Sequence, residues 1–159
     1  MDNKPIRGFA GFEMFPLLVI PVAIYNFIAL VSPNAPSGSV ESGTVAAIRA
    51  EAFALPMLSQ TSLSLSWGDL LVLLAIVLLL VEVVKSARTT SAAIANHMLS
   101  FGVFIMCLIE FLLLPGFASA AFFLITMIVL LDALAGMAVT IVSARRDSGP
   151  GTNVTHPTR

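Results

Sequence analysis

Four stretches of the sequence are dominated by apolar residues. They run from about Met14 to Val31, from Trp67 to Val84, from Ala93 to Leu114 and from Phe117 to Val142. Each is close to the roughly 20 residues that a helix needs to cross a bilayer. In lipid a backbone must satisfy its own hydrogen bonds, and runs such as LLVLLAIVLLL lack the alternation of a barrel strand. The pattern therefore predicts an all-α membrane protein, a bundle of four transmembrane helices.

The first stretch is the least regular of the four. Pro16 and Pro21 are expected to bend or loosen its helix, because proline lacks the backbone N–H. Basic residues precede the stretch, as they do in a secretory signal peptide. However, Glu13 and Pro16 interrupt its entry, and prolines spoil a cleavage site around Ser32 to Ala35. We therefore expect an uncleaved first span.

The segment 32–66 separates the first two spans as an outer loop. It begins with SPNAPSGSVESG, which is rich in proline, glycine and serine and predicts irregular chain. A short helix between Val45 and Leu55 is indicated by apolar residues three and four positions apart, and Pro56 ends that pattern. The segment is interpreted either as an interfacial helix that caps the bundle or as an ordered loop.

The composition agrees with this class of protein. Hydrophobic residues make up 58% of the 159 residues and charged residues 11%, whereas soluble domains have roughly half and about a quarter. The net charge of −1 leaves no basic surface for nucleic acid. Cys107 is the only cysteine, so the chain forms no internal disulfide. The lipid bilayer is the partner that the composition requires.

Lysine and arginine are distributed unevenly about the spans. Of the eight, only Arg49 falls on the side of the outer loop, and the other seven lie on the opposite side: Lys4, Arg7, Lys85, Arg88, Arg145, Arg146 and Arg159. Cytoplasmic segments are enriched in both residue types. We therefore expect cytoplasmic termini, a single membrane domain over residues 1–146, a disordered cytoplasmic tail over residues 147–159, and a bacterial inner membrane as the location.

Two carboxyl groups stand out among those inside the predicted spans. Asp132 lies near the middle of span four, and Glu110 lies near the outer end of span three. An ionisable group at the centre of a membrane helix costs about 2.5 to 3.5 kcal/mol on insertion scales, so each needs an explanation. The functional explanation is a path for protons or cations. The structural explanation is a neutral, hydrogen-bonded strut that fixes helix packing.

Polar and small residues form one face on each of the last two spans, at about 100° per residue. The face of span three includes Asn96, Ser100, Cys107 and Glu110. The face of span four includes Ala118, Ala121, Gly136 and Ser143. Small residues let membrane helices approach closely, so we expect this helix-packing face to meet the polar face of span three.

The register of this contact follows from the turn between the two spans. Pro115 and Gly116 are typical of a turn and predict a tight antiparallel hairpin. Equal distances from the turn set Asp132 opposite Ser100 or Leu99, with Asn96 one helical turn away and His97 nearby if it rotates inward. Ser100 and Asn96 can donate hydrogen bonds to the carboxyl group. They are therefore the expected partners of Asp132.

Glu110 has no such partner on the hairpin. Tyr25 and Asn26 of span one lie at a similar depth, and we expect them to contact Glu110. Glu82 is expected to reach the membrane edge and pair with Lys85, three residues later, as helix-surface residues often do.

Few kinds of chemistry remain open to this chain. It has two histidines, and it lacks a glycine-rich phosphate loop, an HExxH helix and a serine elbow. We expect neither catalysis, nor a cofactor, nor a metal site. The first hypothesis is a non-catalytic membrane protein that acts through its spans as an accessory subunit, a scaffold or a homo-oligomer. The alternative is a proton-coupled small-solute transporter or channel subunit that uses Asp132 and Glu110.

Overall fold

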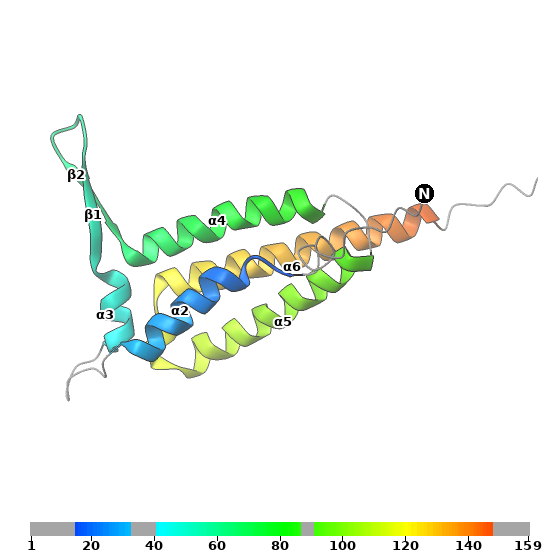
Figure 1. The fold of residues 1–159 in the computed structure, drawn as a ribbon, viewed down its shortest axis with the longest axis horizontal. Helices are drawn as coiled ribbons and strands as arrows, with labels where there is room; N and C mark the ends of the chain where they lie inside the picture. Colours follow the sequence, from blue (N-terminus) through cyan, green and yellow to red (C-terminus); the bar gives the residue numbers. More distant parts are fainter. Residues whose placement is uncertain (1–14, 33–40, 87–90, 148–159) are drawn as a thin grey trace, which may run out of the picture.

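The computed structural model describes residues 15–32, 41–86 and 91–147, and this part of the chain is mostly helical (Figure 1). Three predicted features lie outside the described residues: the beginning of the first span at Met14, the irregular chain over 33–40 and the tail beyond Asp147. The elements are α2 (Val19–Val31), α3 (Gly43–Arg49), β1 (Glu51–Pro56), β2 (Ser62–Ser66), α4 (Trp67–Ser86), α5 (Ser91–Leu113), the 3-10 turn η1 (Pro115–Phe117) and α6 (Ala120–Asp147).

Three helices in the described ranges are long and apolar enough to cross a membrane. They are Trp67–Lys85 in α4, Ala95–Leu113 in α5 and Ala120–Ala138 in α6. α6 packs against both of the others, and 44% of its spanning window is buried, against 22% for each of the windows in α4 and α5. α6 is therefore the central helix of the bundle, and α4 and α5 turn most of their apolar side chains outward.

The bundle has two ends, which we name by residues that lie there. At the Ser86 end, α4 ends, α5 begins and α6 ends. At the Pro115 end, α4 begins and the turn η1 connects α5 to α6, and α3 and the two strands lie at this end as well (Figure 1).

α2 is shorter than the first span that the sequence predicts. Its 13 residues correspond to about 20 Å of helix, less than the thickness of a hydrocarbon core. Pro16 precedes the helix, and Pro21 lies in its first turn, where backbone N–H groups have no intrahelical partner. Both prolines therefore lie at or before the start of α2, and its later turns are free of proline.

The segment between Val45 and Leu55 is only partly helical, which corrects the predicted length of the short outer helix. α3 ends at Arg49, because Ala50 has extended backbone angles, φ −59° and ψ 138°. Val45 and Ile48 are buried on α3, whereas Leu55 belongs to a strand. β1 and β2 form an antiparallel hairpin that projects away from the helices at the Pro115 end (Figure 1). This hairpin is not among the elements predicted from the sequence.

The boundaries of the fourth span also differ from the prediction. Phe117 lies in η1, and α6 begins at Ala120, after Ser119. The Oγ of Ser119 accepts a hydrogen bond from the N–H of Phe122 at 3.1 Å and so caps the helix. At its other end α6 continues to Asp147, so the first residue of the predicted tail is helical.

An aromatic group closes the core at the Pro115 end. The ring of Tyr25 lies 5.3 Å from that of Phe117 and 4.6 Å from that of Phe122, between ring centroids. The Tyr25 hydroxyl lies 2.8 Å from Ser119 Oγ and donates to the carbonyl oxygen of Gly116 at 3.2 Å. Tyr25 therefore fastens α2 to the start of α6, and its own side chain is fully buried.

Candidate functional site

Glu82 is the centre of a buried polar cluster near the Ser86 end. Its side chain is completely buried. Oε1 lies 2.8 Å from Lys85 Nζ and also accepts a hydrogen bond from Asn96 Nδ2, and Oε2 accepts one from the backbone N–H of Leu17 at 3.0 Å. One carboxylate thus joins α4, the start of α5 and the residue that leads into α2.

The local backbone explains why Leu17 supplies this donor. The residues before Val19 are not helical, and the first N–H groups of a helix have no partner inside it. A buried N–H group without a partner costs about 1 to 3 kcal/mol. Glu82 satisfies the N–H of Leu17 and is itself neutralised by Lys85, whose Nζ also donates to the carbonyl oxygen of Phe15 at 2.8 Å.

The position of Glu82 differs from the prediction in one respect. The pair with Lys85 is present, but Glu82 does not reach out to the membrane edge. Instead Lys85, only 9% exposed, bends toward the carboxylate and the first described residues of the chain. Glu82 is the main site residue that the sequence did not predict, because only its pair with Lys85 was expected. Its position inside the run LLLVEVV is the available signal.

Asn96 contacts a different carboxyl group from the one predicted. Its amide donates to Glu82 rather than to Asp132. Its side-chain oxygen Oδ1 is buried and has no hydrogen-bond partner among the described residues. Asn96 therefore links α5 to α4.

Asp132 lies deep in the bundle and is bound to α5 through Ser100. The Ser100 hydroxyl donates to Asp132 Oδ2 at 2.6 Å, and both side chains are 1% exposed. The hairpin register therefore brings these two residues together. Glu82, Lys85 and His97 also lie within electrostatic range of Asp132. Glu82 and Asp132 thus belong to one electrostatic cluster, although no hydrogen bond joins them among the described residues.

His97 occupies the space above Gly136. A Cβ atom built on Gly136 would lie 1.9 Å from His97 Cγ, so only glycine leaves room for this ring. His97 is 5% exposed, and neither ring nitrogen has a hydrogen-bond partner among the described residues. Its two unpartnered nitrogens are the feature of this buried imidazole that packing does not explain.

Glu110 lies away from this cluster, nearer the Pro115 end. Asn26 Nδ2 donates to Glu110 Oε2 at 3.2 Å, so these two residues are brought together. Tyr25 is not, because its hydroxyl is bonded to Gly116 and Ser119. Its predicted contact with Glu110 is therefore wrong.

The predicted helix-packing face of span four divides between two neighbours. Gly136 meets His97 of α5, but Ala121 lies against Gly68 of α4, where a Cβ on Gly68 would come within 2.9 Å of the Ala121 Cβ. Ala118 is exposed and precedes α6. The side chain of Ser143 lies outside the described residues. The small residues therefore bring α6 close to both α4 and α5, not to α5 alone.

The chemistry available to the cluster is that of proton binding and charge compensation. In the part of the chain that the structure describes, no three histidine, cysteine, aspartate or glutamate side chains are grouped as metal ligands. The fold and cluster define a helical protein of membrane type with a buried ionisable network. Comparison with protein-family models, with curated proteins and with solved structures gives no match.

Proposed function

We propose that this chain is a non-catalytic, four-span protein of a bacterial inner membrane that serves as an accessory subunit, a scaffold or a homo-oligomer. Three candidate spans are present, and the segment around α2 supplies the fourth. At one end of this segment Leu17 is bonded to Glu82 near the Ser86 end, and at the other Tyr25 is bonded to Gly116 at the Pro115 end. The segment thus contacts α4 near the Ser86 end and the turn η1 at the Pro115 end, and the distribution of lysine and arginine favours cytoplasmic termini.

The observation that carries the structural role is the set of bonds made by Glu82. Its two oxygens accept from Leu17, Asn96 and Lys85, so the charge is balanced and the acceptor sites hold segments together. Ser100 and Asp132 make a similar bond between α5 and α6. Polar groups used in this way raise the specificity of helix packing inside a membrane.

The outward faces of α4 and α5 supply surface for association. Side chains such as Leu80, Val84 and Leu112 are 66%, 69% and 68% exposed. Lipid covers such surfaces in a monomer, and a partner helix or a second copy covers them in an assembly. A protein that works by assembly needs surface of this kind and a rigid interior behind it.

The proposal is tested by extracting the protein with its native lipid and measuring its mass and its co-purifying chains. The expected result is a defined complex or homo-oligomer in which Asp132→Asn and Glu82→Gln reduce thermal stability or drop a partner. A monodisperse single chain without partners across a range of expression levels would contradict this role.

His97 favours a second candidate function, that of a proton-coupled small-solute transporter or channel subunit. Its unpartnered ring nitrogens lie in electrostatic range of Asp132, whose cluster contains Glu82 and Lys85. An imidazole and two carboxyl groups in one buried cluster are groups that can exchange protons. Glu110 takes no direct part, because it is bonded to Asn26 near the other end.

Proton flux into liposomes distinguishes the two functions. For a transporter, liposomes with the wild-type protein show a proton flux, and His97→Gln and Asp132→Asn abolish it. The mass and melting temperature of both variants stay close to those of the wild type. For a scaffold, wild-type liposomes show no flux above that of empty liposomes, and Asp132→Asn alters assembly or stability only. Glu51→Gln, a change at an exposed strand residue, is the matched control.

A further inference from the structure

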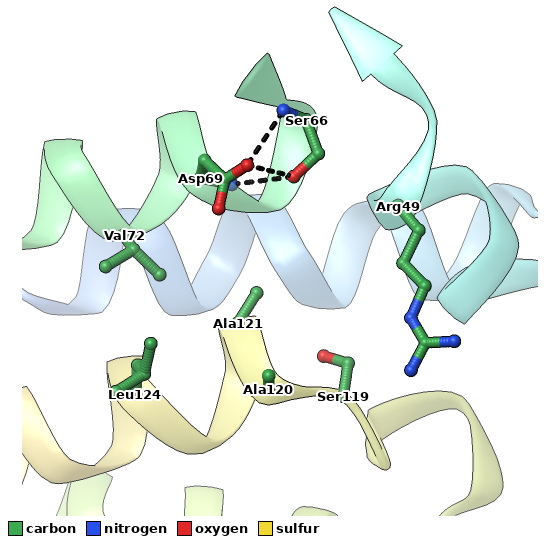
Figure 2. A pocket seen from close by; sticks show the side chains of 8 residues that line it. All are labelled: Arg49, Ser66, Asp69, Val72, Ser119, Ala120, Ala121 and Leu124. Atoms are coloured by element: carbon green, nitrogen blue, oxygen red, sulfur yellow. Dashed lines mark hydrogen bonds between the residues drawn. The ribbon is translucent and has the colours of Figure 1, made fainter. Parts of the chain in front are cut away.

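A cavity of about 270 Å³ lies at the Pro115 end, away from the buried cluster. It is bounded by the end of α3, the start of α4 and the start of α6 (Figure 2). Its lining consists of Arg49, Ser66, Asp69, Val72, Ser119, Ala120, Ala121 and Leu124. None of these residues belongs to the cluster around Glu82. The cavity is therefore a separate feature of the molecule.

The cavity carries one positive and one negative side chain that are not paired with each other. Figure 2 shows Arg49 and Asp69 at different places around it, with Ser119 and the alanines below them. In the described part of the chain, Arg49 is bonded through Nη1 alone, which lies 2.6 Å from Glu41 Oε1. Exposed ion pairs of this kind contribute about 0 to 1 kcal/mol, and a guanidinium has five N–H donors. Arg49 can therefore bind a further anion.

Asp69 also retains an acceptor. Its Oδ2 accepts from Ser66 N at 2.8 Å and from Ser66 Oγ at 2.6 Å, while Ser66 Oγ accepts from Asp69 N at 3.2 Å. This reciprocal arrangement is a capping box at the start of α4. Both bonds to the carboxylate use Oδ2, so Oδ1 has no partner within the described ranges. The capping box holds the carboxylate in place and leaves one oxygen for a ligand.

The remaining wall is apolar and leads from the charged rim into the membrane spans. Val72 belongs to the candidate span of α4, and Leu124, which is 47% exposed, belongs to that of α6. Gly68 of α4 and Ala121 of α6 lie in close contact beside the cavity, because a Cβ atom at Gly68 would meet Ala121 Cβ at 2.9 Å. The wall is thus formed by two closely packed helices, and its apolar side chains belong to their candidate membrane spans.

We propose that this cavity binds a zwitterionic phospholipid with a phosphoethanolamine headgroup. The guanidinium of Arg49 binds the phosphate, Oδ1 of Asp69 binds the ammonium group, and one acyl chain lies along Val72 and Leu124. Arginine suits a phosphate because its planar N–H groups bind two oxygens at once. Asp69 repels a purely anionic headgroup and so selects a lipid that carries an amine. This assignment does not depend on either function proposed above.

Native mass spectrometry of the full-length protein tests the assignment. The probes are phosphatidylethanolamine, phosphatidylglycerol with the same acyl chains, and soluble phosphoethanolamine. Wild-type protein is expected to retain phosphatidylethanolamine in preference to phosphatidylglycerol. Arg49→Gln is expected to weaken retention of both lipids about tenfold, as for loss of a charge-assisted hydrogen bond. Asp69→Asn is expected to remove the preference between the two lipids.

Two further variants keep the test decisive. Glu51→Gln removes an exposed carboxylate outside the cavity lining and should retain the lipids as the wild type does. Leu124→Trp fills the apolar wall without changing a charge and should weaken retention of both lipids even if Asp69→Asn unfolds. Equal retention of the two lipids by wild-type protein, or displacement of the lipid by soluble phosphoethanolamine at equal concentration, would overturn the proposal.

Discussion

The backbone N–H of Leu17 donates to Oε2 of Glu82 at 3.0 Å, across 65 positions of sequence. This bond holds the residues before α2 against the last turns of α4. It is made by a side chain with no exposed surface, inside the apolar run LLLVEVV of α4. The stability of the bundle should therefore depend on Glu82 more than on any charged residue at its surface.

Glu82→Ala tests this dependence. The substitution leaves the N–H of Leu17 and the ammonium group of Lys85 without their buried partner. Removing one member of a buried ion pair costs about 3 to 5 kcal/mol, so a loss of this size is expected in unfolding experiments in detergent. Glu82→Gln should cost less, because its oxygen still accepts from Leu17. Unfolding of Glu82→Ala at the wild-type denaturant concentration would show that the bond contributes little.

Gly136→Ala tests the contact between α6 and His97. The added methyl group would lie 1.9 Å from His97 Cγ, so the ring must move. Overpacking of this kind costs about 1 to 3 kcal/mol. The matched control is Gly102→Ala, because a Cβ there meets nothing within 4 Å. His97→Ala should restore much of the stability lost in Gly136→Ala, and failure of this rescue would place the strain elsewhere.

The long helices could be predicted from sequence because the length of an apolar run is a local property. α4 begins at Trp67 as predicted, and the hairpin register brings Ser100 to Asp132 because both lie at similar distances from the turn at Pro115 and Gly116. In these cases the apolar pattern within one segment, and the short turn that connects two helices, determine the structure.

Other features depend on contacts between segments far apart in the sequence. Glu82 is the centre of the buried polar cluster because the non-helical residues before α2 reach the Ser86 end, where Leu17 donates to it. Asn96 also donates to Glu82 and not to Asp132. The hairpin was missed for a different reason. The spacing of three and four between Val45 and Leu55 resembles a helix, whereas the alternation of SLSLS over 62–66 favours a strand.

Ser119→Ala and Tyr25→Phe separate two roles of one hydroxyl group. Ser119 Oγ accepts from the N–H of Phe122 at the start of α6 and also lies 2.8 Å from the Tyr25 hydroxyl. Loss of an N-cap costs about 0.5 to 2 kcal/mol. Ser119→Ala should therefore destabilise the protein more than Tyr25→Phe, which removes the link to α2 but leaves the cap. Thermal unfolding of both single variants and the double variant measures the coupling, and equal effects of the single variants would argue against a capping role.

The orientation of the protein is tested at the turn of the β-hairpin. Ser59 lies exposed between β1 and β2, and the buried Cys107 is the only native cysteine. In a Cys107→Ala background, Ser59→Cys should react with a membrane-impermeant maleimide added to intact spheroplasts, because the hairpin follows the outer loop of the proposed topology. Ser148→Cys, beyond the last span in the sequence, should react only after the membrane is permeabilised. The reverse pattern would place the seven clustered basic residues outside, against the bias that orients membrane helices.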